Sequence, residues 1–311
     1  MPQKYGPSQL RMRHNDVHVT AEAARELDSF KSQPINFKIG FWDPSVNGMR
    51  YLKALTYNLA AGLSAESRAR LRRIDNRNVG EPITVKYAGD EVCMDYVQAV
   101  LELEFITAGF NPDGRRILEV GAGYGRACHT MLSNHDVAAY YIVDLENSLT
   151  LARGYLGKVL DADQFAKVHF LTIDEVDELP DSTRFDLGLG VNAFAEMTVD
   201  TVRDYLGFFD QRCDHFYVKD PVGKYLDNSL DGHAEGREVV ELALTTGMLQ
   251  DVIDVHDSEA VEAHSRNFVS AYQPGPAWHC LADSWAKPWS FYWQALYQKR
   301  AAGAAEVSDR P

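Results

Sequence analysis

Short apolar runs alternate with amphipathic segments along the second part of the chain, beginning at Arg115. The apolar runs have the length of strands, whereas the segments between them repeat their apolar residues at helical spacing. Strands are predicted at residues 117–120, 140–143, 168–171, 185–190 and 216–218, and helices at residues 126–133, 148–160, 199–209 and 235–246. Strands that alternate with helices in this way favour a parallel sheet with both faces covered.

Both ends of the chain depart from this alternation. Residues 251–255, 267–272 and 290–298 are strand-like, with little helix between them. Before the first strand, the spacing of apolar residues predicts helices at residues 21–30, 45–63 and 90–108, and a short helix capped by Ser64. We therefore expect an N-terminal helical extension over residues 1–110, a main domain over residues 111–300 and a disordered tail over residues 301–311.

The most informative motif is the turn after the first predicted strand of the main domain. Gly121, Gly123 and Gly125 follow the acidic Glu119 in the spacing G-x-G-x-G and precede a helix. A tight strand-to-helix turn uses positive φ, and a glycine leaves room for a ligand against the main chain. The dinucleotide fingerprint has its third glycine one residue later, where this chain has Arg126. The spacing therefore favours an adenosyl ligand without a pyrophosphate over NAD.

With an acidic residue followed by G-x-G-x-G, the chain resembles the class I S-adenosylmethionine-dependent methyltransferases. This resemblance implies an α/β fold with a Rossmann-like, seven-stranded sheet, mostly parallel, with an antiparallel C-terminal strand. It also implies S-adenosyl-L-methionine as the cofactor. The first motif would then contribute the cofactor-binding residues Glu119, Gly121, Ala122, Gly123, Tyr124 and Gly125.

The next two strand ends supply further cofactor-binding candidates. Asp144, followed by Leu145, ends the second predicted strand, where a carboxylate can accept hydrogen bonds from both hydroxyls of a ribose. Its alternative role is to cap the following helix. In the family, the loop after the third strand covers the adenine, which indicates Thr172 and Ile173, while His169 is expected within the strand.

In the same family, the end of the fourth strand lies beside the transferable methyl group, which indicates Asn192 and Ala193 as cofactor-binding residues. Asn192 and the later pair Glu196-Met197 resemble a narrower group, the sugar O-methyltransferases of natural-product pathways. This resemblance extends over about residues 80–298. It implies a sugar-like small molecule as the methyl acceptor.

A sugar hydroxyl is a poor nucleophile at neutral pH, so its methylation needs a positioned base. The candidates follow the fourth and fifth strands and are Glu196, His233 and Asp220. Glu196 can instead cap the next helix or orient Asn192. Asp220 can belong to a turn with Pro221, and His233 can be an exposed residue in the first turn of a helix.

Magnesium could be bound through Asp220, Asp227 and Asp231, because some sugar methyltransferases use this ion to bind a diol. Carboxylates in loops are more often solvated, so no required metal is predicted. Near the C-terminus, Trp293 is expected to pack in the core, whereas Trp278 and His279 either contact substrate or pack between strands. The N-terminal helices form either a lid over the acceptor or the surface of a homodimer.

Charge and composition limit the partners of this 311-residue chain. A total of 45 acidic and 31 basic residues gives a net charge of −14, which disfavours nucleic acid and suits a neutral or cationic small molecule. No stretch approaches the roughly 18 apolar residues that span a bilayer, and residues 1–16 lack a signal-peptide core. The 4 cysteines form no C-x-x-C pair, so we expect reduced thiols, no membrane partner and a cytoplasmic protein.

Together these features predict an S-adenosylmethionine-dependent O-methyltransferase that acts on a sugar or aminocyclitol hydroxyl in specialised-metabolite (antibiotic) biosynthesis. The first alternative is an N-methyltransferase for an amino sugar or another small amine. Two others are a Rossmann-type, NAD-dependent oxidoreductase and a non-catalytic protein that binds the adenosyl ligand.

Overall fold

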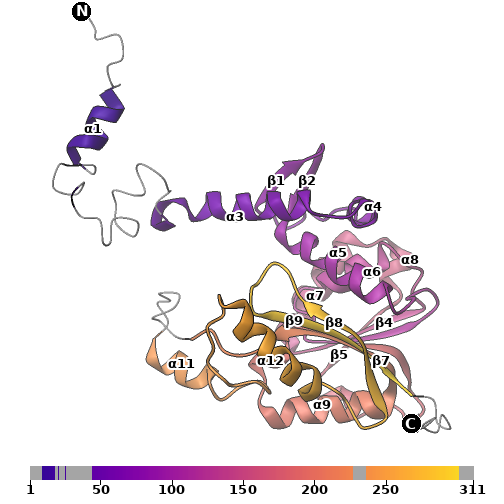
Figure 1. Ribbon diagram of the computed structural model, residues 1–311. Coiled ribbons are helices and arrows are strands. Elements are labelled where there is room, and N and C mark those ends of the chain that lie inside the picture. Colours follow the sequence, from indigo (N-terminus) through magenta and orange to yellow (C-terminus); the bar gives the residue numbers. More distant parts are fainter. Residues whose placement is uncertain (1–8, 18–19, 21–24, 26–43, 227–235, 301–311) are drawn as a thin grey trace, which may run out of the picture. The chain divides into compact units, whose positions relative to one another are not determined.

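The computed structural model describes residues 9–17, 20, 25, 44–226 and 236–300 (Figure 1). The predicted tail at residues 301–311, and all of the predicted helix at residues 21–30 except residue 25, lie outside the described residues. By its internal contacts the chain divides into two units, Met1–Asn58 and Leu59–Pro311.

The first unit contains helix α1 (Gln9–Val17) and most of helix α3 (Pro44–Ala61). Helix α3 confirms the helix predicted at residues 45–63. Within it, the Thr56 hydroxyl donates a hydrogen bond of 2.8 Å to the Leu52 carbonyl, one turn earlier. In the described parts of both units, no helix combines the length and the apolar composition needed to cross a membrane.

A seven-stranded sheet organises the second unit, in the spatial order β5-β4-β3-β6-β7-β9-β8. Its strands are β3 (Arg116–Val120), β4 (Ala139–Asp144), β5 (Val168–Thr172), β6 (Phe185–Val191), β7 (Cys213–Pro221), β8 (Trp278–Trp285) and β9 (Tyr292–Lys299). Strands β3 to β7 are parallel, and β9 is antiparallel to both of its neighbours. The predicted Rossmann-like α/β sheet with an antiparallel C-terminal strand is confirmed, as are the five predicted parallel strands.

Helices cover both faces of this sheet (Figure 1). Successive residues of β3 point to opposite faces, so Ile117 and Leu118 belong to two separate apolar clusters. The cluster around Ile117 contains residues from α5 (Met94–Thr107), α6 (Arg126–Leu132) and α7 (Glu146–Val159). The cluster around Leu118 contains residues from α9 (Val199–Arg212) and α12 (Ser258–Ala271). Burial on both faces explains why these strands are almost continuously apolar.

Helix α4 (Ala65–Arg73) and a β-hairpin lie between α3 and α5 in the sequence. This helix begins as predicted, with the Ser64 hydroxyl accepting a hydrogen bond of 3.0 Å from the Ser67 amide. Strands β1 (Thr84–Tyr87) and β2 (Asp90–Cys93) pair antiparallel, because Ala88 and Gly89 take positive φ and reverse the chain. The helix predicted from residue 90 therefore begins only at Met94.

The predictions for the C-terminal region are partly wrong. Residues 267–272 are mostly the end of α12, because Val261, Ser265 and Phe268 recur at helical spacing on its buried face. Residues 251–255 contain a single isolated bridge from Val252 to Lys224 rather than a strand. Strand β8 was not predicted, since exposed and buried residues do not alternate along it and a bulge interrupts its pairing with β9. The remaining short helices are α8 (Ala162–Phe165) and α11 (Arg237–Ala243).

Candidate functional site

The glycine turn joins β3 to α6 and uses positive φ at all three glycines, 73° at Gly121, 57° at Gly123 and 90° at Gly125. A Cβ on Gly121 would lie 2.6 Å from the Cβ of Ala193, and one on Gly125 would lie 2.8 Å from Leu156. These two glycines therefore allow close packing of the protein against itself. A Cβ on Gly123 would meet nothing within 4 Å, and this residue lines a cavity. Gly123 thus leaves bare main chain facing the open space.

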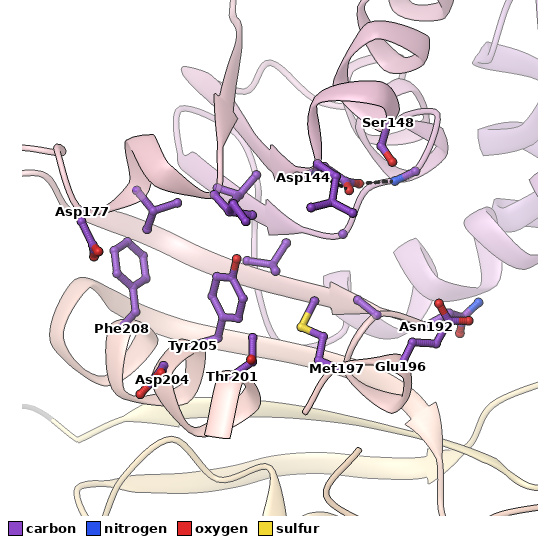
Figure 2. Close-up of a pocket in the computed structure, with 18 residues that line it drawn as sticks. Asp144, Ser148, Asp177, Asn192, Glu196, Met197, Thr201, Asp204, Tyr205 and Phe208 are labelled. Carbon is purple, nitrogen blue, oxygen red and sulfur yellow. Dashed lines mark hydrogen bonds between the residues drawn. The ribbon is translucent and has the colours of Figure 1, made fainter. Parts of the chain in front are cut away.

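Asp144, the last residue of β4, is hydrogen-bonded to this turn. Its Oδ2 accepts a hydrogen bond of 3.0 Å from the Gly123 amide, and its Oδ1 accepts one of 2.7 Å from the Leu145 amide (Figure 2). Helix α7 has Leu145 at its N-cap position, and no side chain caps it. Asp144 therefore joins two adjacent strand ends instead of capping the helix, and its carboxylate is partly exposed.

A cavity of about 680 Å³ opens at the carboxyl ends of the parallel strands. In open parallel sheets this edge is where ligands bind, and the volume lies within the range of small-molecule sites. Of the predicted cofactor-binding residues, the cavity brings together Gly121, Gly123, Asp144, Leu145, Ile173, Asn192 and Ala193. The other lining residues are Val120, Val143, Ser148, Val176, Asp177, Glu196, Met197, Thr201, Asp204, Tyr205 and Phe208.

Helix α9 supplies one wall of the cavity, which the sequence analysis did not anticipate. Figure 2 shows the rings of Tyr205 and Phe208 projecting from this helix into the cavity, across from Asp144. Thr201, Asp204, Tyr205 and Phe208 are spaced three, four and seven residues from the first, which places them on one face of a helix. Burial, with the charges of Asp144 and Asp177, raises the pKa of Tyr205. These four residues lie within the helix predicted at residues 199–209, so their spacing in the sequence already indicated that they share one face of that helix.

The cavity is acidic. Its lining contains the four carboxyl groups of Asp144, Asp177, Glu196 and Asp204. Among the described residues that form the lining, none is lysine, arginine or histidine. A concave site lined by charges of one sign attracts ligands of the opposite sign and repels ligands of the same sign.

The remaining members of the first motif lie outside the cavity lining. Glu119 is buried and accepts a hydrogen bond of 2.8 Å from the Tyr140 hydroxyl; burial raises the pKa of this carboxyl to about 7. The Tyr124 hydroxyl donates a hydrogen bond of 3.0 Å to Asp95, at the start of α5. Ala122 packs against the core cluster around Ile117.

Thr172 ends β5 and also lies outside the lining. Its hydroxyl and its amide both donate to Glu175, which fixes the turn that carries Ile173. His169 lies within β5, as predicted, and its ring stacks on Tyr141 with the centroids 4.4 Å apart. Thr172 therefore shapes the loop beside the cavity, and Ile173, Val176 and Asp177 of this loop line it.

The structure separates the three candidate bases. Glu196 lines the cavity in the short turn η4 (Phe194–Glu196) after β6. Asp220 is fully buried at the end of β7 and does not line the cavity; burial raises its pKa to about 8. His233 lies outside the described residues, as do the possible metal ligands Asp227 and Asp231. In the part of the chain that the structure describes, no group of three or more His, Cys, Asp or Glu side chains is arranged to hold a metal ion.

A buried ionic network lies behind the site and was not predicted. Lys219 of β7 donates a hydrogen bond of 2.7 Å to Glu102 of α5, and the Arg126 guanidinium lies 3.1 Å from the same carboxyl group. Both cations hold the pKa of Glu102 below its usual value against the effect of burial. The Lys219 carbonyl accepts a hydrogen bond of 2.8 Å from the Asn192 amide. The network therefore connects α5 and the helix after the glycine turn to the strand that supports Asn192.

The aromatic residues near the C-terminus have mainly structural positions. Trp278 is 2% exposed within the core, and its indole donates a hydrogen bond of 2.7 Å to Asp210. It therefore packs between elements and does not line the cavity. Trp293 packs against the same core cluster, as predicted, and donates to Asp283. His279 is partly buried in β8 and is also absent from the cavity lining.

No family model matches the chain, and no curated protein matches it. Among solved structures, it is similar to the mitomycin 7-O-methyltransferase MmcR at 12% identity, with 66% of this chain and 56% of that chain covered and a TM-score of 0.42. The methyltransferase domain of bacterial CtHen1 shows 12% identity, coverage of 65% and 97%, and a TM-score of 0.46. The magnesium protoporphyrin IX methyltransferase ChlM from Synechocystis PCC 6803, with bound SAH, shows 13% sequence identity and a TM-score of 0.43. This similarity covers 76% of this chain and 95% of that chain. All three likenesses are distant.

Proposed function

We propose that this chain is a class I methyltransferase that binds S-adenosyl-L-methionine in the acidic cavity and methylates a hydroxyl group of a small molecule. The observation that carries the proposal is the pairing of Gly123 with Asp144. Gly123 leaves open space over its main chain, and the Asp144 carboxylate stands beside it at the same sheet edge. This arrangement suits a nucleoside that rests on the turn with its ribose against the carboxylate.

The lining residues fit the separate parts of this cofactor. The Asp144 carboxylate uses two of its roughly four acceptor positions for the Gly123 and Leu145 amides, which leaves two for vicinal hydroxyls. Ile173 and Phe208 offer apolar surface that suits a purine. Glu119 acts indirectly in this scheme, because it is buried below the turn.

The charge of the cavity supports this cofactor over NAD. A pyrophosphate would meet four carboxyl groups and no cationic side chain among the described lining residues. The positive sulfonium of S-adenosylmethionine is favoured by the same surroundings. The arrangement of charges therefore agrees with the glycine spacing in disfavouring the oxidoreductase alternative.

Glu196 is the base that we propose for the acceptor hydroxyl, since it lines the cavity, whereas Asp220, the other candidate base within the described residues, does not. When bound, the cofactor supplies a methyl group on a positively charged sulfur. Glu196 would accept the proton that the acceptor hydroxyl loses, and Asn192, which also lines the cavity, would help to orient the acceptor. The acceptor class that we propose is a sugar or aminocyclitol unit of a specialised metabolite, on the resemblance of Asn192 and Glu196-Met197 to sugar O-methyltransferases. Amine methylation is the second candidate, favoured by the acidic lining, which attracts cations.

Isothermal titration calorimetry with S-adenosylmethionine, S-adenosylhomocysteine and NADH tests the cofactor. We expect the two adenosyl ligands to bind with dissociation constants in the micromolar range and NADH not to bind. Binding of NADH alone would refute the proposal. A mass-spectrometric screen of sugar, aminocyclitol and amine compounds for a gain of one methyl group then identifies the acceptor atom. Tight adenosyl binding without methylation of any class of compound would favour a non-catalytic role.

A further inference from the structure

The turn between β6 and α9 carries four residues that line the cavity, Asn192, Ala193, Glu196 and Met197. Asn192 has a φ of 55°, which is costly for a residue with a side chain. A backbone in this conformation persists only where surrounding groups fix it. The contacts on the far side of the turn, away from the cavity, therefore bear on the geometry of the site.

Asp220 holds the turn from the end of β7. Its carboxyl group has no exposed surface and accepts a hydrogen bond of 3.1 Å from the Phe194 amide. Among the described residues its Oδ1 has no hydrogen-bond partner. Burial of a carboxyl group is unfavourable. Here it is offset in part by satisfying the Phe194 backbone amide in the turn.

Lys224 and Thr246 hold the same turn from a different part of the chain. The Ala195 carbonyl accepts a hydrogen bond of 3.2 Å from the Lys224 ammonium and one of 2.8 Å from the Thr246 hydroxyl. The next residue, Gly247, donates its amide to the Met197 carbonyl at 2.7 Å. Lys224 is only 7% exposed, and the charges of Asp220 and Glu196 oppose the lowering of its pKa by burial.

We infer that Asp220, Lys224 and Thr246 are positioning residues that clamp the turn from behind and so fix Asn192 and Glu196 at the cavity. The inference rests on the proposed function for the role of the cavity, but the clamp itself is a property of the free protein. Asp220 holds the Phe194 amide of the turn, while Lys224 and Thr246 hold the Ala195 carbonyl. None of the three lines the cavity, so their effect on a ligand passes through the turn.

Hydrogen–deuterium exchange of the free protein tests the clamp without a cofactor or an acceptor. We expect exchange of the amides of residues 193–197 to rise about tenfold or more in Asp220→Ala and Lys224→Met, and about threefold in Thr246→Val. Asp220→Asn should stay near the wild type, because an amide oxygen can still accept from Phe194. In titration calorimetry, S-adenosylhomocysteine should bind about three- to tenfold more weakly to Asp220→Ala, Lys224→Met and Thr246→Val than to the wild type.

Matched controls are Asp214→Asn in β7, Lys167→Met and Thr245→Val, all outside the clamp. They should leave both exchange and affinity unchanged. Unchanged exchange at residues 193–197 in Lys224→Met and Thr246→Val would overturn the inference. If Asp220→Ala does not fold, these two variants alone test whether the clamp exists. Faster exchange with unchanged affinity for S-adenosylhomocysteine would also overturn the link to the site. If the wild type binds no adenosyl ligand, the proposed function is wrong. Hydrogen–deuterium exchange of the free protein then still tests whether the three residues hold the turn.

Discussion

The amide of Gly123 donates a hydrogen bond of 3.0 Å to the carboxylate of Asp144, which joins the turn after β3 to the end of β4. Two residues that follow or end neighbouring strands thus line the cavity together. Gly123 supplies main chain without a side chain, and Asp144 supplies acceptor oxygens. The predictions that follow test this surface and the walls around it.

Asp144→Ala should weaken the binding of S-adenosylhomocysteine by about 10- to 100-fold, since hydrogen bonds to a charged group contribute about 1.5–3 kcal/mol each. Titration calorimetry measures the effect, and thermal unfolding should show a fold that remains intact. Asp163→Ala, at an exposed position of α8, is the matched control and should bind as the wild type does. Equal affinity in Asp144→Ala and the control would remove Asp144 from the site.

Gly123→Ala and Gly125→Ala should have different consequences. Both place a Cβ at positive φ, which costs about 1 kcal/mol. At Gly125 the new Cβ would also lie 2.8 Å from Leu156, so this variant should lose more stability in urea unfolding. At Gly123 the methyl group enters the space beside the cavity, so affinity for S-adenosylhomocysteine should fall more than stability. A Gly123→Ala protein with full affinity would show that no ligand rests on this main chain.

Phe208→Leu and Phe209→Leu separate the cavity wall from the core. Phe208 lines the cavity, whereas its neighbour Phe209 is fully buried and stacks on Phe216 with the ring centroids 4.6 Å apart. We expect Phe208→Leu to lower affinity for S-adenosylhomocysteine several-fold with little change in stability. Phe209→Leu should destabilise the protein by about 1–3 kcal/mol through loss of packing. The reverse pattern would place the ligand away from α9.

Glu196→Gln should lower the rate of O-methylation by about 100-fold or more, because general bases contribute roughly 10²–10⁴. Affinity for S-adenosylhomocysteine should change little, since the carboxyl and amide groups have nearly the same shape. Single-turnover kinetics with the acceptor found by mass spectrometry would measure this. An undiminished rate would indicate an amine acceptor or a different base.

Glu119→Gln should flatten the dependence of stability on pH. Burial raises the pKa of Glu119 from 4.5 to about 7, so the folded protein holds this proton more tightly than the unfolded chain. The contribution of protonated Glu119 to the free energy of unfolding is complete below pH 4.5 and is lost as the pH rises through 7. The free energy of unfolding changes by about 3 kcal/mol over this range. Urea unfolding at pH 5, 6, 7 and 8 should therefore show a smaller decline in the variant. Identical slopes in both proteins would contradict a raised pKa at this position.

Local requirements explain which parts of the site could be predicted. A strand-to-helix turn at positive φ favours glycine, and Gly121, Gly123 and Gly125 all take positive φ. Asp144 could be placed at the same edge because the carboxyl ends of parallel strands lie together. The apolar composition of the strands likewise reflects burial on both faces of the sheet. For this reason the five parallel strands could be predicted from the sequence.

Long-range contacts explain what could not be predicted. Asp220, at the end of β7, was a candidate base together with Glu196, yet it is buried and does not line the cavity, whereas Glu196 does. The burial of Trp278 in the core depends on packing between β8, β9 and the helices, which the local sequence does not specify. Strand β8 itself forms through pairing with β9, since its own pattern does not alternate.

The sequence by itself determined the α/β sheet, the glycine turn and the carboxylate beside it, because each follows from backbone geometry or from the period of apolar residues. The tertiary structure alone decided that Tyr205 and Phe208 of α9 face the cavity and that Asp220, Lys224 and Thr246 hold the turn between β6 and α9. The physical reason is that a periodic pattern specifies which residues share a face. Which element that face meets depends on the order of the strands and on contacts between residues far apart in the chain.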